Sequence, residues 1–165
     1  MNPGKQFEED FKKSIPDDTY YLRLHDSSIG FDVENSTQRF ALQSPYDIVL
    51  CRNGQMYSLE QKSNKEKSMS FGDNKNARIK TAQVQNLLKA EQAGAIAGLV
   101  LNFRTYEQTY FVKASDFYVF MQTSGKKSIN ISDASRIGVL VPCRKLKVHY
   151  RYDIGAILNL VEDKI

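Results

Sequence analysis

Apolar residues recur along the chain at spacings that change between those of helices and those of strands. Phe7, Phe11 and Ile15 are four residues apart, which predicts a first helix over 3–15 that buries one side. The same spacing predicts further helices over 77–93, with Gly94 as a C-terminal cap, over 114–122 and over 152–161.

Strands are predicted where β-branched and aromatic residues gather in short runs. The clearest runs are 20–24, 95–103 and 109–112, and a less regular one contains Ile29, Phe31 and Val33. The polar segment 63–76 is expected to be a mobile basic loop, and 126–132 and 138–142 to be short surface pieces. Together these elements predict an α/β fold, with a mixed central β-sheet flanked by helices.

Residues 44–62 contain two strand-like runs on either side of Asn53-Gly54. This dipeptide tolerates the two positive φ angles of a type I′ turn, so it predicts a β-hairpin with a two-residue loop. A loop of that length fixes the register of the two strands, and this register places Asp47 opposite Glu60.

The register also sorts the hairpin side chains onto two faces. The face expected to lie on the core holds Ile48, Leu50, Tyr57 and Leu59. The other face holds Asp47, Val49, Cys51, Met56, Ser58, Glu60 and Lys62. Two carboxylates with Cβ atoms about 5 Å apart repel each other unless a cation or a shared proton lies between them.

A hard cation such as Mg²⁺ is held by one or two carboxylates together with water and substrate phosphate. Asp47 and Glu60 are therefore candidate metal ligands, with the positive charge of Lys62 on the same face. The alternative is a solvent-exposed hairpin face whose acids point into water.

The composition is that of one ordinary globular domain spanning residues 1–165, with 41% hydrophobic and 25% charged residues. No apolar run approaches the ~20 residues of a membrane span, and no secretory signal is recognisable, so the protein is expected in the cytosol. Cys51 and Cys143 lack the spacing of a metal site and are expected to be small core residues.

The net charge is +4, and the basic residues are clustered. Residues 62–80 hold six Lys or Arg against two acids, and residues 126–151 hold seven against one. Clustered positive charge favours a phosphate-rich partner such as DNA, although a basic loop without a partner has the same composition. The residues expected to contact DNA are Lys65, Lys67, Lys75, Arg78, Lys80, Lys126 and Lys127.

Other catalytic chemistries lack the residues that they need. His25 and His149 are isolated, which argues against zinc or histidine-based nucleophilic catalysis. No glycine-rich phosphate loop or dinucleotide-binding fingerprint is present, so no nucleotide cofactor is expected. Gln83 shares an apolar stripe with Ile79 and Leu87, and it either ends in a local hydrogen bond or reaches the catalytic edge.

The motif Pro45-x-Asp47 followed by Glu60-x-Lys62 resembles the signature of the PD-(D/E)xK nucleases. This resemblance implies a restriction-endonuclease-like core. It also implies Mg²⁺, with Mn²⁺ as a substitute, held by Asp47, Glu60 and the backbone carbonyl of Gln61. Lys62 would position or deprotonate the attacking water.

The order of the elements also resembles that of the RecU-type Holliday junction resolvases of Gram-positive bacteria and their phages. The opening Asn2-x-Gly4-Lys5-x-Phe7-Glu8 is similar to the N-terminal helix of that family, which implies that Glu8 supports the metal site. Gln83-Val84 followed by Leu87 is similar to its glutamine-containing helix, which implies a catalytic role for Gln83.

Two departures from this family concern the stretch before the hairpin. Only Ser44 stands where the family has a Thr-containing stretch, and only 27–43 could serve as the stalk that enters the centre of a junction. The short stalk and the small size favour a phage over a bacterial source.

The resemblance implies a metal-dependent endonuclease that hydrolyses phosphodiester bonds in four-way DNA junctions. Since two strands are cut symmetrically, it also implies a homodimer with two sites. Two alternatives stay open: another nuclease of the superfamily, of the restriction or exonuclease type, and a non-catalytic basic DNA-binding protein that assists recombination.

Overall fold

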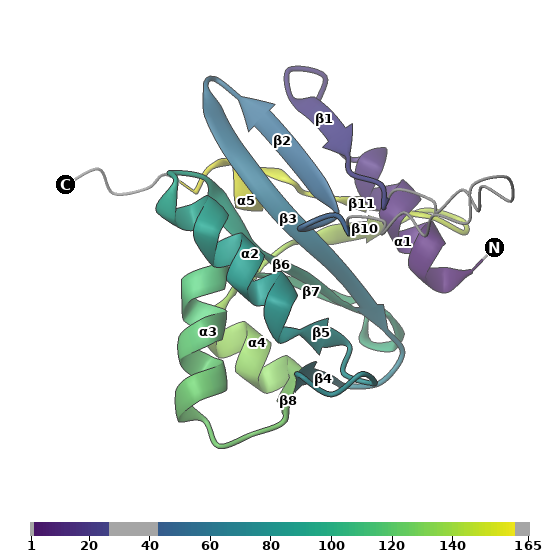
Figure 1. Cartoon of the computed structure of the whole chain (residues 1–165). Coiled ribbons are helices and arrows are strands. Elements are labelled where there is room, and N and C mark those ends of the chain that lie inside the picture. The colour runs from purple at the N-terminus through teal and green to yellow at the C-terminus, as the bar shows by residue number, and fades with distance from the viewer. Residues whose placement is uncertain (1, 27–42, 161–165) are drawn as a thin grey trace, which may run out of the picture.

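The computed structural model describes residues 2–26 and 43–160 (Figure 1). The extended piece predicted around Phe31 and nearly all of the proposed stalk segment 27–43 lie outside these residues. Within the described parts of the chain, no helix is long and apolar enough to cross a membrane.

A six-stranded sheet forms the centre of the fold, with its strands in the order β1-β2-β3-β6-β7-β9. The strands are β1 (Tyr20–Arg23), β2 (Ile48–Arg52), β3 (Gln55–Asn64), β6 (Ile96–Phe103), β7 (Gln108–Lys113) and β9 (Val139–Leu140). β3 and β6 are parallel and all other pairs are antiparallel, so the predicted mixed sheet is confirmed. A short 3-10 turn, η1 (Arg104–Tyr106), joins β6 to β7.

The predicted hairpin is confirmed in both its turn and its register. Asn53 and Gly54 have φ angles of 51° and 79°, as a type I′ turn requires. Pairing runs from Arg52–Gln55 to Ile48–Leu59 without a slip.

The sheet has a hydrophobic core on each face. The first core packs against α1 (Pro3–Lys12) and α5 (Gly155–Leu158) and contains the predicted core face of the hairpin, all at or below 3% exposure. The second core lies under α2 (Thr81–Gln92), α3 (Ala114–Thr123) and α4 (Ile131–Ile137). Figure 1 shows α2 and α3 on one side of the sheet, away from α1. β6 runs between the two cores and is buried along its whole length.

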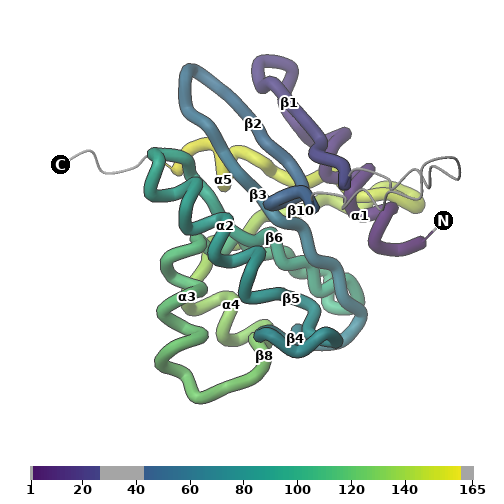
Figure 2. Tube along the Cα trace, viewed as in Figure 1, coloured from purple at the N-terminus to yellow at the C-terminus, as the bar shows by residue number. Residues whose placement is uncertain are grey.

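The prediction of a mobile loop over 63–76 was wrong. β3 continues to Asn64, and the chain then turns back as β4 (Ser68–Gly72), which Figure 2 traces. Met69 and Phe71 of β4 are buried because β5 (Ile79–Lys80) and β8 (Ser128–Asn130) pair on either side of it.

Several element boundaries also differ from the prediction. Ile79 belongs to β5, so α2 begins at Thr81 rather than at residue 77. The expected surface piece 126–132 contains the buried Ile129, and an unpredicted helix, α4, begins at its end and fills the gap before 138–142. A second hairpin, β10 (Cys143–Lys145) and β11 (Tyr150–Tyr152), replaces the start of the predicted last helix. Cys51 and Cys143 are half-buried instead of forming part of the core.

Candidate active site

Asp47 lies one residue before β2 and is held against the backbone of β3. Its amide donates to the carbonyl of Leu59 at 3.1 Å, and its Oδ2 accepts from the amide of Gln61 at 2.7 Å. The antiparallel pairing thus continues past the last ladder pair and brings the Asp47 carboxylate next to the strand that carries Glu60. The sequence-predicted pair of acids lies together at this edge of the sheet.

Glu60 is an almost fully buried acid, with a side chain that is 4% exposed. Its Oε1 receives the Lys62 ammonium at 2.8 Å and the Gln83 amide at 2.6 Å. Burial, together with the neighbouring Asp47 charge, raises the pKa of Glu60 to about 7, although Lys62 and Arg23 act to lower it. The folded protein therefore makes this carboxylate hold a proton, or another cation, unusually tightly.

Gln83 connects the acidic pair to the start of α2. Its side-chain oxygen accepts from the amide of Lys80 at 3.0 Å, while its amide donates to Glu60. Of the two roles considered for this residue, the hydrogen bond to Glu60 favours the one at the catalytic edge. Ile79 does not share a helical stripe with it, because Ile79 precedes the helix.

Arg23 is the residue at this site that sequence reasoning missed. Its guanidinium contacts the carboxylate of Glu8 at 3.1 Å, that of Asp47 at 3.9 Å and the side-chain oxygen of Gln61 at 3.4 Å. A signal did exist, since Arg23 is the one basic residue of the predicted strand 20–24. Pairing this strand with the hairpin would have placed it beside Ile48.

Glu8 reaches this site from α1. It contacts the Arg23 guanidinium, which also lies near the Asp47 carboxylate. Among the described residues, no three His, Cys, Asp or Glu side chains gather closely enough to hold a metal ion by themselves. Glu8 as a metal ligand stays a prediction, as does the carbonyl of Gln61.

The pair of acids still fits a hard cation bound in part by substrate. In the described parts of the chain, no hydrogen bond reaches the second oxygen of Glu60, and Oδ1 of Asp47 has only the long contact to Arg23. Mg²⁺ takes one or two carboxylates and fills its remaining positions with water and phosphate oxygens. The site thus offers two anionic oxygens and leaves the other positions open.

A cleft of about 450 Å³ opens beside these residues. The ends of β1 and β2 form one wall and the first turns of α2 form the other, with Lys80, Gln83 and Asn86. The free backbone amides at a helix N-terminus attract anions, and Lys80 adds a positive charge. A phosphate group in this cleft would therefore lie between Arg23 and Lys80.

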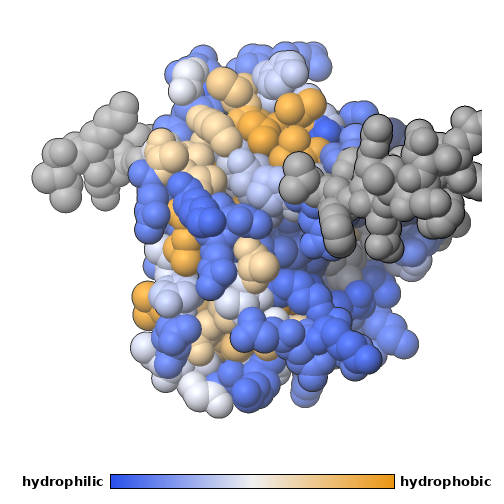
Figure 3. All heavy atoms as spheres, in the orientation of Figure 1, coloured by the Kyte–Doolittle hydropathy of each residue, from blue (hydrophilic) through white to orange (hydrophobic). Residues whose placement is uncertain are grey.

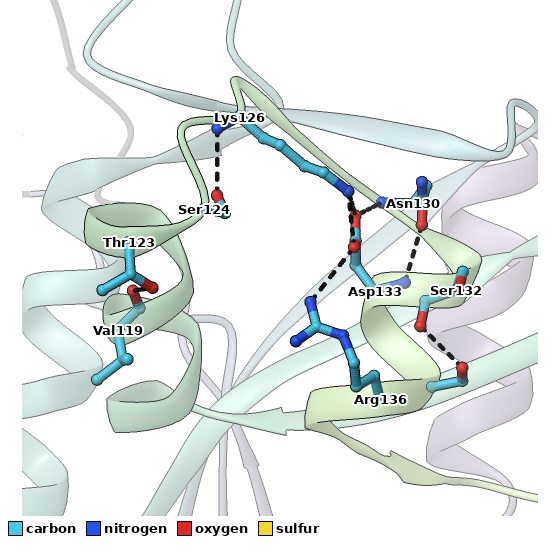
Figure 4. Close-up of polar contacts among 9 residues, drawn as sticks. Val119, Thr123, Ser124, Lys126, Asn130, Ser132, Asp133 and Arg136 are labelled. Carbon is cyan, nitrogen blue, oxygen red and sulfur yellow. Dashed lines mark hydrogen bonds and ion pairs between the residues drawn. The ribbon is translucent and has the colours of Figure 1, made fainter.

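The remaining predicted DNA contacts are spread over the end of the molecule that holds β4 and β8. Lys65, Lys67, Lys75 and Lys127 are exposed. Arg78 donates to Asn64, and Lys80 to the carbonyls of Asn74 and Lys75. Lys126 contacts both oxygens of Asp133 at 2.8 Å (Figure 4). The contacts of these residues with DNA stay predictions.

An apolar surface lies beyond the cleft, on the face of the sheet that carries Asp47 and Glu60. Tyr20, Leu22 and Met56 are 64%, 43% and 38% exposed, and Val49 and Cys51 lie half-buried between them. Figure 3 shows apolar atoms gathered over this end of the sheet, above a hydrophilic surface. We call these five residues the apolar face.

Known proteins resemble this chain in sequence and in fold. The family model described as RecU, recombination protein U, matches residues 31–154. The SPbeta prophage-derived uncharacterized protein YotM of Bacillus subtilis (strain 168) is 31% identical over 166 residues, which cover 92% of this chain and 82% of that protein.

A solved structure with a similar fold is that of Hjc, a Holliday junction resolvase from the archaeal hyperthermophile Archaeoglobus fulgidus. It aligns with a TM-score of 0.51 at 19% identity and covers 82% of this chain and 93% of its own. At this identity the likeness concerns the fold.

Proposed function

Because the chain belongs to the RecU family of recombination proteins, we propose that it is a metal-dependent endonuclease that resolves four-way DNA junctions by phosphodiester hydrolysis. The observation that carries the proposal is the buried Glu60 carboxylate beside Asp47, in contact with Lys62 at 2.8 Å. The fold that the chain shares with an archaeal resolvase supports it.

Asp47 and Glu60 would hold Mg²⁺, for which Mn²⁺ would substitute, with the carbonyl of Gln61 and Glu8 as further predicted ligands. When bound, the metal stabilises negative charge on the phosphate that is attacked and lowers the pKa of bound water. The raised pKa of Glu60 supports a cation at this position, because a second positive charge offsets the cost of burying the carboxylate.

The remaining roles belong to side chains of the chain itself. Lys62, which is 19% exposed, would orient the attacking water or take its proton. Gln83 would fix the orientation of the Glu60 carboxylate through its 2.6 Å hydrogen bond, as a positioning residue. Arg23 would exchange its contact with Glu8 for the phosphate of the DNA strand.

We also propose that a second copy of the chain covers the apolar face. None of its five side chains is charged, so it offers nothing to a DNA phosphate, whereas the chain as a whole carries a net charge of +4. An uncharged surface lets two copies of a basic protein meet without repulsion, and it would place two clefts on the same side, as paired cuts require.

The dimer is tested by measuring mass in solution. Leu22→Glu puts a charge into the apolar face and should give a monomer, whereas Val119→Glu, at a 57% exposed position of α3, should leave the dimer intact. A wild-type monomer at micromolar concentration would contradict the proposal.

The activity is tested with a labelled mobile four-way junction, Mg²⁺ and an Asp47→Asn control. Paired symmetric nicks that the variant does not make, although it still binds the junction, would establish the resolvase. Equal cutting of a linear duplex with the same arm sequence would favour another nuclease of the superfamily. Binding without nicks in Mg²⁺ and in Mn²⁺ would favour the accessory protein.

The prophage origin of YotM supports a phage source for this protein, and we propose that it acts as a single nuclease domain in the bacterial cytosol.

A further inference from the structure

The β10–β11 hairpin carries an unusual pair of like charges. Its two strands pair so that Arg144 lies directly opposite Arg151, and a hydrogen bond from Leu146 to the carbonyl of His149 closes the turn. Lys147 stands exposed in that turn. Like charges that face each other across two strands destabilise the pairing unless a counter-charge lies between them.

Among the described residues, no carboxylate forms an ion pair with Arg144 or Arg151. The acids that reach the hairpin are Glu107, which pairs with Lys145 at 2.7 Å, and Asp10, which contacts His149 at 2.8 Å. The guanidinium of Arg151 donates to the adjacent backbone carbonyl, at 2.9 Å, and Arg144 is exposed. Asp153 follows Arg151 by two residues, but its Oδ1 accepts from the amide of Gly155 at 3.0 Å. Arg144 and Arg151 thus face each other without an ion-pair partner in the described parts of the chain, and Lys147 adds a charge at the turn.

The hairpin is nevertheless held firmly against α1. Asp10, which is 1% exposed, accepts hydrogen bonds from the ring of His149 and from the amide of Tyr150 at 3.0 Å. Gln6 donates to the carbonyl of Val148, and Ser14 accepts from the amide of Tyr152. Because α1 fixes the hairpin in place, little conformational freedom is lost when its charges bind a ligand.

The same helix relates the hairpin to the candidate active site. Glu8 lies two residues from both Gln6 and Asp10, about 200° around the helix, so it faces the opposite side. Helix α1, which is about 10–12 Å across with its side chains, therefore separates the hairpin from the candidate active site.

We propose that Arg144, Lys147 and Arg151 bind the phosphate backbone of a DNA arm, at a site apart from the candidate active site. The phosphates supply the counter-charge that the paired arginines lack. This inference rests on the proposed function only for the identity of the DNA; the hairpin site is separate from the acidic pair.

The test is the salt dependence of junction binding, measured with a labelled four-way junction between 50 and 200 mM KCl in EDTA. Each phosphate contact contributes about 0.9 to the slope of log affinity against log salt, so Arg144→Gln with Lys147→Gln should lower the slope by about 1.8. The loss of affinity should therefore be about tenfold larger at 50 mM than at 200 mM KCl. The matched control, Lys89→Gln with Lys113→Gln, removes the same charge at two positions outside the expected DNA contacts and should leave the slope nearly unchanged.

A second variant separates binding from folding. In the Arg144→Glu variant, a carboxylate would lie opposite Arg151 and form an ion pair across the strands. This variant should therefore have a higher melting temperature and bind the junction more weakly. An unchanged slope in the double variant, or a fall equal to that of the control, would overturn the proposal.

The two proposals fail in different ways. If wild type cleaves the junction and the hairpin variants bind as wild type does, the hairpin is not a DNA site. If wild type binds without cleaving while the hairpin variants bind weakly, the hairpin site holds and the nuclease does not.

Discussion

Glu60 and Asp133 are both buried acids that contact a lysine ammonium at 2.8 Å, yet their surroundings differ. The carboxylate of Asp133 caps α4: it accepts from Lys126 at both oxygens, from the amide of Asn130 and from Arg136 (Figure 4). Glu60 receives Lys62 and Gln83 on one oxygen only, and the negative charge of Asp47 lies beside it.

Burial acts to raise the pKa of both acids, but their net pKa shifts have opposite signs. Burial alone would raise the pKa of Asp133, but the hydrogen bonds from Lys126 and Asn130 outweigh it, so that pKa is lowered. For Glu60 burial prevails, and the pKa rises to about 7. The same lysine–carboxylate contact thus stabilises a helix end in one place and leaves a site short of positive charge in the other.

The largest expected contrast is between the two lysines. Lys62→Met should slow cleavage about 10³-fold, or about 4 kcal/mol in the barrier, because a positioned proton acceptor is lost. Lys126→Met should leave the cleavage rate of fully bound DNA unchanged, since any contact of Lys126 with DNA affects binding alone, and should lower stability by about 2 kcal/mol because Asp133 loses a charged partner. Single-turnover cleavage and urea unfolding measure the two effects. Equal cleavage rates for the two variants would contradict the expected difference between Lys62 and Lys126.

Stability in EDTA should depend on pH with opposite signs at the two acids. The pKa of Glu60 is raised from 4.5 to about 7 on folding, so the folded state holds this proton more tightly and loses on the order of 3 kcal/mol as pH rises through that window. Glu60→Gln should remove this loss. The pKa of Asp133 is lowered from 3.8, so its contribution disappears as pH falls through and below that value, and Asp133→Asn should resemble wild type there. Thermal melts at pH 3 to 9 measure both effects. If wild type, Glu60→Gln and Asp133→Asn showed the same dependence of melting temperature on pH, the two acids would not differ as expected.

Mg²⁺ should stabilise the folded protein by binding at Glu60 and not at the Asp133 cluster. At a concentration about 100 times its dissociation constant, it adds about 2.7 kcal/mol to the free energy of unfolding, or about 5–10 °C in melting temperature. Glu60→Gln and Asp47→Asn should shrink this shift, whereas Asp133→Asn should keep it. A shift of the same size in all variants would indicate that the metal binds elsewhere.

The smallest effect is expected at the rim of the Asp133 cluster. Arg136 is 67% exposed and lies 3.5 Å from Asp133, so solvent screens the pair. Arg136→Ala should cost less than about 1 kcal/mol in urea unfolding. A cost equal to that of Lys126→Met would mean that the cluster acts as one network.

The parts of the site that depend on local pairing could be predicted from the sequence. Asn53-Gly54 alone sets the register that brings Asp47 to Glu60, because a two-residue turn leaves no freedom of alignment. The same locality made the helices at 3–12 and 114–123 predictable, since their apolar residues repeat within one element.

The parts that were missed depend on partners far along the chain. β4 shows the alternation of a strand at Met69 and Phe71, but its partner β8 begins at Ser128, so the segment looked like a polar loop. Arg23 contacts Glu8 and Asp47 only after β1 has paired with β2 across a long connection. The prediction of helix 77–93 failed at its start for the same reason, because Ile79 pairs with Phe71.

The contacts between α1 and the β10–β11 hairpin also bear on when the protein is completed during synthesis. The partners of Asp10 lie 139 and 140 residues further along, and contacts between such distant residues form late because closing a long loop costs entropy. We expect α1 to be readily cut by protease in chains arrested on the ribosome before residue 148 emerges, and protected once residue 152 has emerged. Since α1 carries Glu8, the nascent chain would stay without its full acidic centre until then, and a nuclease would not act on DNA while it is still being made.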